Sequence, residues 1–242
     1  MKKHKGLKLG VVAVLLLCGV CWAYAADFYH ADDIAMAAMN SAADVTVEQK
    51  GNTLAFIPED AETGLIFYPG GKVEYTAYAP LMRALADNGV LSVLVRMPLN
   101  LAVLHVNAAN GIPEQYPQIR HWYIGGHSLG GSMAASHAAK NAFAYDGLVL
   151  LASYSTADLS ASGLRVISIF GSKDGVLNME KYAEYKRNLP AALEEHIIEG
   201  GCHAGFGSYG AQDGDGVPML TGEEQIAETV QLLTAFYKST KE

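Results

Sequence analysis

Positive charge is scarce in this sequence. The 242 residues include 17 lysine and arginine residues against 25 aspartate and glutamate residues, so the formal net charge is −8. A protein that binds nucleic acid needs a basic surface that neutralises phosphate groups. We therefore expect no nucleic-acid partner for this chain.

Cysteine is scarcer still, with three residues in the whole chain. Cys18 and Cys21 lie in an apolar segment near the N-terminus, and only Cys202 lies beyond it. This spacing offers no zinc-type ligand set, and the histidine and aspartate residues are too scattered to suggest another metal site. We expect neither a metal nor another cofactor.

Repeats and low-complexity stretches are absent as well, while half of the residues are hydrophobic. Apolar runs typical of buried strands alternate with helical periodicity, which predicts one α/β domain over residues 44–240 with a doubly wound, mostly parallel sheet of about eight strands. The expected strands are 45–48 and 53–57 (an antiparallel edge hairpin), 64–68, 91–96, the run before Gly126, 147–151, 166–170 and 195–199. Helices are expected at 77–88, after residue 131, and from a capping box at Thr221 and Glu224 onward.

Residues 122–131 (WYIGGHSLGG) form the most informative stretch of the chain. An apolar strand leads into the pattern Gly-x-Ser-x-Gly, and a helix of small residues follows directly. This strand–turn–helix context is typical of a nucleophile elbow, in which a tight turn exposes the serine hydroxyl at the carboxyl edge of a sheet. Gly126 and Gly130 suit the turn because a side chain at either position would collide with a neighbouring element. The pattern predicts Ser128 as a nucleophile.

A serine nucleophile needs a histidine base and an acid that orients it, and on such a fold the acid precedes the histidine in the chain. The strand 166–170 ends in a glycine-rich turn, 171–175 (GSKDG), which places Asp174 at the same sheet edge as Ser128. Asp158 and Asp146 remain alternatives, although they resemble loop or strand-entry residues.

The base is expected after the last strand, where residues 200–206 (GGCHAGF) place His203. The other histidines fit this position less well. His137 lies within the helix after the elbow, His196 lies inside a strand, and His121 precedes the elbow. Cys202 follows the wrong strand for a nucleophile and is interpreted as a small buried residue or part of the pocket wall.

The developing negative charge on a reacting carbonyl needs two backbone N–H donors. One is the amide after the nucleophile, here that of Leu129 at a helix N-terminus. The second is expected in the loop after the strand 64–68, where Gly70 and Gly71 let the backbone approach a substrate closely. Gly71 is the first choice for this donor and Lys72 the second.

Four stretches together resemble the α/β-hydrolase superfamily, in particular the branch called α/β-hydrolase fold-5, which is related to dienelactone hydrolases. They are 67–73 (FYPGGKV), 97–104 (MPLNLAVL), 126–131 (GHSLGG) and 203–210 (HAGFGSYG), and the run 212–216 (QDGDG) follows them. The resemblance covers about residues 60–235 and implies a triad of Ser128, Asp174 and His203. Dienelactone hydrolases usually carry a cysteine nucleophile, so the serine here weakens the transfer of their substrate.

Many hydrolases of this fold insert a helical cap before the strand that carries the acid. The link 153–165 is too short for a cap, so we expect an open site that prefers short acyl esters or small lactones. The long connection 97–118 has an apolar first half that could line the acyl site. The residues expected in the substrate pocket are Lys72, Leu101, Leu104 and His127.

The first 26 residues differ in kind from the rest. Residues 1–8 carry four lysines, and residues 9–26 are eighteen residues without a charge. This pattern is typical of a signal peptide or an N-terminal membrane anchor. Ala23 and Ala25 offer a cleavage pattern, whereas Trp22 and Tyr24 favour a retained anchor. We expect an exported domain, either membrane-anchored on the extracytoplasmic side or secreted or periplasmic after cleavage, with 27–43 as a connecting segment.

Three functions are compatible with this sequence. The first is a serine hydrolase that cleaves carboxylic esters or related acyl bonds of small molecules through an acyl-enzyme. The second is an acyltransferase that uses the same triad, with an alcohol or amine in place of water. The third is a membrane-tethered binding module without activity, for which a missing triad member would be the sign. The sequence does not define the oligomeric state.

Overall fold

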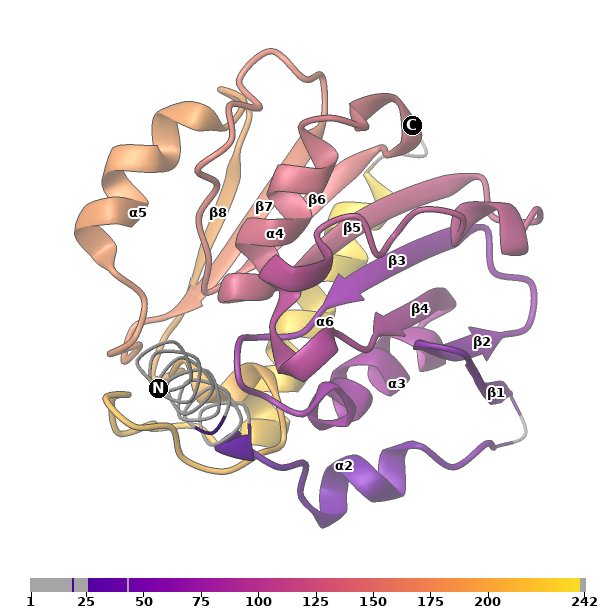
Figure 1. Ribbon diagram of the computed structural model, residues 1–242, viewed down its shortest axis with the longest axis horizontal. Helices are drawn as coiled ribbons and strands as arrows, with labels where there is room; N and C mark the ends of the chain where they lie inside the picture. Colours follow the sequence, from indigo (N-terminus) through magenta and orange to yellow (C-terminus); the bar gives the residue numbers. More distant parts are fainter. Residues whose placement is uncertain (1–18, 20–25, 43, 240–242) are drawn as a thin grey trace, which may run out of the picture.

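The computed structural model describes residues 19, 26–42 and 44–239. Its centre is one eight-stranded sheet in the order β1-β2-β4-β3-β5-β6-β7-β8 (Figure 1). The strands are β1 (Val45–Lys50), β2 (Thr53–Pro58), β3 (Thr63–Tyr68), β4 (Val90–Val95), β5 (His121–His127), β6 (Gly147–Leu151), β7 (Arg165–Gly171) and β8 (Glu194–Ile198). The six strands from β3 to β8 run parallel, and β1 and β2 form an antiparallel hairpin at one edge. The doubly wound, mostly parallel sheet expected from the sequence is confirmed.

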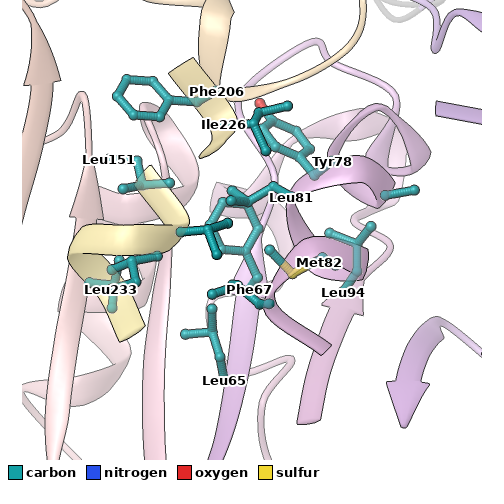
Figure 2. Packing of buried hydrophobic residues seen from close by; sticks show 14 of the residues in the cluster. Leu65, Phe67, Tyr78, Leu81, Met82, Leu94, Leu151, Phe206, Ile226 and Leu233 are labelled. Carbon is teal, nitrogen blue, oxygen red and sulfur yellow. The ribbon is translucent and has the colours of Figure 1, made fainter. Parts of the chain in front are cut away.

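Helices cover both faces of this sheet, because its parallel strands are apolar on both sides. The α-helices are α2 (Asp33–Ala38), α3 (Ala79–Asp87), α4 (Leu129–Ala138), α5 (Met179–Tyr185) and α6 (Gly222–Lys238). Figure 1 shows α3 and α6 on one side of the sheet and α4 on the other. Successive residues of β3 divide between the two cores: Leu65 and Phe67 pack under α3 and α6, whereas Ile66 and Tyr68 pack under α4. Figure 2 shows the first of these cores.

One helical segment begins differently from the sequence expectation, and another begins as expected. The helix expected over 77–88 is divided into a 3-10 turn, η1 (Tyr75–Tyr78), and α3, which has Pro80 in its first turn. A proline fixes the backbone for the first turn of a helix and lacks the N–H that a preceding turn would need. The capping box of α6 is present as expected, with the Thr221 and Glu224 side chains each bonded to the other's backbone N–H.

The connection between β6 and β7 carries no α-helix, so the domain has no separate cap, as the sequence predicts. The segment from residue 27 to 42 packs on the domain. Tyr29 pairs with Val73 in a β-bridge, the Asp32 N–H donates to the Ser208 carbonyl, and α2 contacts α3.

The predicted signal peptide or membrane anchor at residues 1–26 lies, apart from Gly19 and Ala26, outside the described residues. Within the part of the chain that the structure describes, no helix combines the length and the hydropathy needed to cross a membrane.

Candidate active site

The turn between β5 and α4 has the geometry of a nucleophile elbow. Ser128 has φ of 52° and ψ of −124°, a left-handed conformation that side-chain-bearing residues rarely adopt. A Cβ atom on Gly126 would lie 2.5 Å from the Tyr68 carbonyl oxygen, and one on Gly130 would overlap the same oxygen. The two glycines are therefore required by close packing of the elbow against the end of β3, as the sequence predicts.

Hydrogen bonds fix the backbone of Ser128 on both sides. Its N–H donates to the Leu151 carbonyl over 2.9 Å, and its own carbonyl accepts from the Ser153 hydroxyl over 2.7 Å. Both partners lie at or just after the end of β6, the next strand of the sheet. The serine itself is only half-buried. The neighbouring strand thus holds the strained turn in place while the side chain remains open to a substrate.

The structure pairs His203 with Asp174. Asp174 follows the end of β7, and His203 follows the end of β8 in the loop leading to η7 (Ala204–Phe206). His203 Nδ1 lies 2.9 Å from Asp174 Oδ2 and 3.1 Å from Oδ1, and both side chains are 1% exposed. Asp174 Oδ1 also accepts the N–H groups of Val176 and Leu177. These bonds orient the carboxylate toward the imidazole, the arrangement in which an acid holds the base of a triad.

The second ring nitrogen of His203 is available for chemistry. Nε2 is buried and has no hydrogen-bond partner within the described residues. The His203 ring lies 4.5 Å, centroid to centroid, from the ring of His127, the residue that precedes Ser128. His203 therefore lies beside the elbow, with Nδ1 bound to Asp174 and with no partner for Nε2 among the described residues.

The two alternative acids lie elsewhere. Asp158 is exposed and accepts the N–H and hydroxyl of Ser160. Asp146 accepts the Trp122 N–H near the amino end of β5, at the opposite edge of the sheet from the elbow. Asp174 is therefore the carboxylate, of the three considered, that the structure brings to His203.

The two backbone N–H groups expected in the oxyanion hole belong to segments that pack against each other. A Cβ atom on Gly71 would lie 3.0 Å from the Leu129 side chain, so the loop after β3 packs against the start of α4. Within the described part of the chain, neither the Gly71 nor the Leu129 N–H has a hydrogen-bond partner. The second choice, Lys72, donates its N–H to the Asn100 carbonyl and pairs its ammonium group with Asp27. Gly71 and Leu129 are thus the better pair of donors.

A buried chain of hydrogen bonds connects this loop to the elbow. The Gly70 N–H donates to the Tyr78 hydroxyl over 3.1 Å, and that hydroxyl lies 2.7 Å from His127 Nδ1. Since the hydroxyl accepts from Gly70, its own proton is free to bind His127, which suits a neutral imidazole. Burial, followed by the neighbouring His203, holds the pKa of His127 well below its usual range. His127, expected in the pocket wall, is fully buried beneath the elbow.

Of the other residues expected in the pocket, Leu104 lies on η3 (Ala102–His105), and Leu101 is the residue between η2 (Pro98–Asn100) and η3. Leu101 is half-buried, and the Leu104 side chain is 55% exposed. Leu99 and Asn100 both have left-handed backbone angles. A hollow of about 450 Å³ lies next to this segment, at the carboxyl end of β4, and Tyr75, Arg96 and Leu99 are among the residues that line it.

Sequence reasoning missed two residues that fix the loop of the base. The Gln225 side chain on α6 accepts the Cys202 N–H over 2.9 Å and donates to the Cys202 carbonyl over 2.8 Å. Asp215, which the sequence suggested only as part of a turn-rich run, accepts the N–H groups of His203 and Ala204. Hydrogen bonds to distant backbone groups leave no motif in a sequence. Only the position of the 212–216 run, soon after His203, pointed to Asp215.

Cys202 is buried, which agrees with its structural interpretation. Burial and then the Asp215 carboxylate raise the pKa of its thiol to about 11, so the thiol stays protonated and unreactive near neutral pH. Among the described residues, no group of three or more histidine, cysteine, aspartate or glutamate side chains is arranged to hold a metal ion.

A doubly wound sheet with a serine elbow after its central strand, and with an aspartate and a histidine after the next strands, defines the α/β-hydrolase class. The sequence model described as "Alpha/beta hydrolase family" matches residues 64–227, and the chain belongs to this family. The resemblance found in the sequence is thereby confirmed, and membership supports a hydrolytic enzyme. Among the curated proteins, no relative matches.

Several solved structures share the fold. The chain is similar to a dienelactone hydrolase from Anabaena variabilis ATCC 29413 (TM-score 0.58, 15% identity, covering 82% of this chain and 96% of that one). It is also similar to Est1E from Butyrivibrio proteoclasticus (TM-score 0.58, 11% identity, 81% and 98% covered). A third is the esterase domain of a Rhodothermus marinus protein (TM-score 0.60, 11% identity, 79% and 97% covered). At these identities the likeness concerns the fold alone.

Proposed function

We propose that this protein is a serine hydrolase that cleaves carboxylic esters or related acyl bonds of small molecules. The observation that carries the proposal is the strained Ser128 at the N-terminus of α4, beside the buried imidazole of His203. The Nδ1 atom of this imidazole is bonded to the buried carboxylate of Asp174. Solved esterases with the same fold add general support.

In the proposed mechanism the Ser128 hydroxyl oxygen attacks the substrate carbonyl carbon while His203 Nε2 takes the hydroxyl proton. Asp174 holds the Nδ1–H of the resulting imidazolium, and the N–H groups of Gly71 and Leu129 bind the oxyanion. The alcohol leaves with the proton from His203, which gives an acyl-Ser128 ester. Water, deprotonated by the same nitrogen, then releases the carboxylic acid and restores the serine.

The triad is tested with Ser128→Ala, His203→Ala and Asp174→Asn in the full chain. We expect Ser128→Ala to abolish fluorophosphonate labelling and to lower kcat for p-nitrophenyl acetate by about 10⁴-fold or more, because triad residues act as a unit. His203→Ala should be nearly as severe and Asp174→Asn intermediate. Asp158→Asn is the control and should keep full activity. If the probe labelled the Ser128→Ala protein as strongly as it labels the wild type, the assignment of Ser128 would be refuted.

We also propose that residues 1–26 export the domain and retain it at the membrane, with the lysines of residues 1–8 on the inner side. The support is the sequence alone: four lysines followed by eighteen uncharged residues. Fractionation of cells that express the full chain should recover it in the membrane, with the domain cleaved by protease added outside. A soluble cytoplasmic form with an intact N-terminus would refute this proposal.

A further inference from the structure

The turn at residues 213–216 contributes one carboxylate to two separate loops. Asp215 Oδ1 accepts the N–H groups of Gly175 (3.1 Å), His203 (3.1 Å) and Gly216 (2.8 Å), and Oδ2 accepts the Ala204 N–H (2.8 Å). A carboxylate that only stabilised its own turn would need the Gly216 contact alone. Three of its four donors lie 11 to 40 residues away in the sequence.

These donors are neighbours of the acid and the base. Gly175 directly follows Asp174, one donor is the N–H of His203 itself, and another belongs to Ala204, the next residue. The turn also packs tightly on the acid loop, because a Cβ atom on Gly216 would overlap the Lys173 carbonyl oxygen. The two loops follow different strands, so their relative position depends on such contacts between them.

Asp215 is well suited to bind N–H groups. Burial raises the pKa of its carboxyl, but the N–H groups of Ala204, Gly175, His203 and Gly216 outweigh that effect and lower it. The group is therefore ionised at neutral pH, and hydrogen bonds to an ionised acceptor are roughly twice as strong as neutral ones. One side chain thus connects the two loops through three strong hydrogen bonds and makes the fourth within its own turn.

We propose that Asp215 is a positioning residue of the active site, which keeps His203 Nδ1 within hydrogen-bond distance of Asp174. The inference rests on the proposed function, because it gives Asp215 a role in catalysis through His203. The 2.9 Å bond between His203 and Asp174 joins two loops, and Asp215 fixes the backbone of both. Without it, each loop could move separately and the imidazole would lose its orientation.

The test compares Asp215→Asn with Asp213→Asn in the full chain. Asp215→Asn preserves the size of the side chain but removes the charge and one acceptor oxygen, whereas Asp213 is an exposed residue of the same turn. We expect Asp215→Asn to lower kcat for p-nitrophenyl acetate roughly tenfold to a hundredfold, with KM changed by less than about threefold, because substrate binding is left intact. Asp213→Asn should match the wild type, and Asp215→Glu should recover part of kcat.

A second readout does not require turnover. The proton on His203 Nδ1 in the bond to Asp174 should give a low-field ¹H resonance in the wild type and in Asp213→Asn, and this resonance should weaken or vanish in Asp215→Asn. All measurements are made well below the Tm of each variant, so that partial unfolding does not contribute.

The outcomes separate the two proposals. An Asp215→Asn protein with a lower Tm but with wild-type kcat and an unchanged resonance would overturn the positioning role and leave Asp215 as a stabilising contact. A wild-type protein that neither reacts with fluorophosphonate nor hydrolyses the ester would refute the proposed function, and the resonance would then decide whether Asp215 fixes the His203–Asp174 pair.

Discussion

At the scale of single residues, this site combines strain with burial. A left-handed backbone at Ser128 costs on the order of 1 to 3 kcal/mol, which the surrounding structure has to offset. The packing of Gly126 and Gly130 against the end of β3 and the two backbone hydrogen bonds to the end of β6 supply that support. Beneath the turn, His127 and Tyr78 are completely buried and bonded to each other. The proposed nucleophile, Ser128, is therefore positioned by residues that are buried away from a substrate.

The buried His127 makes stability depend on pH. Burial, with His203 nearby, lowers its pKa well below the ordinary value of 6.5. As the pH falls through about 6.5, the unfolded chain therefore binds a proton at this position that the folded chain does not, and stability is lost. The loss is at most about 1.4 kcal/mol per pH unit for one group.

The measurement is the free energy of unfolding in urea between about pH 7 and pH 5, below the ordinary histidine pKa. We expect His127→Gln to lose less stability over this interval than the wild type does. His137, whose pKa is also lowered by burial, adds a loss of the same sign to both proteins. His105→Gln, at an exposed position, is the control and should keep the wild-type slope. An unchanged slope in His127→Gln would contradict the assignment.

At the scale of elements, the order of strands and loops explains how much of the site could be predicted. Parallel strands end at one sheet edge, so residues that follow β5, β7 and β8 meet there. Ser128, Asp174 and His203 could be selected for that reason. The helices α2 and α5 were not predicted. They have six and seven residues, too few for a helical periodicity to stand out.

Contacts between elements could not be read from the sequence. Pairing of Gln225 with Cys202, or of Asp215 with His203, joins side chains to backbone groups that any residue would provide. Tyr78 belongs to the same group: its position in η1 rather than α3 follows from Pro80, and only the fold brings its hydroxyl to Gly70 and His127. Such residues are visible only once the loops are placed in space.

The first turn of α6 provides a prediction at this scale. Gln225→Leu should lower the free energy of unfolding by about 1 to 3 kcal/mol, because it leaves the buried N–H and carbonyl of Cys202 unpaired. It should also lower kcat, since Cys202 precedes the base. Thr221→Ala is the matched control in the same turn: it removes the cap and costs about 1 kcal/mol but does not touch the loop.

Urea unfolding and p-nitrophenyl acetate hydrolysis measure both effects in the two variants. A Gln225→Leu protein with wild-type kcat would show that the loop keeps its geometry without α6, and a lowered kcat in Thr221→Ala would show that the helix acts through its stability alone.

At the scale of the whole molecule, the absence of a cap limits the substrate. The connection between β6 and β7 adds no helix over the sheet edge, and the apolar side chains of Val103 and Leu104 are 53% and 55% exposed. A long acyl chain gains roughly 25 cal/mol for each Å² of apolar surface that it buries. An open surface covers little of such a chain, so additional methylene groups should contribute little to binding.

We therefore expect kcat/KM to be highest for short p-nitrophenyl esters and to stop rising, or to fall, as the acyl chain is lengthened from acetate to palmitate. Each ester is measured below the concentration at which it forms micelles, because aggregation would mimic a loss of activity. Leu104→Ser tests whether this side chain lines the acyl site: it should reduce the rate for butyrate more than for acetate. A kcat/KM that climbs steadily with chain length would contradict the open-site argument and would indicate that the long chain finds a covered apolar surface, as in a lipase working at a membrane.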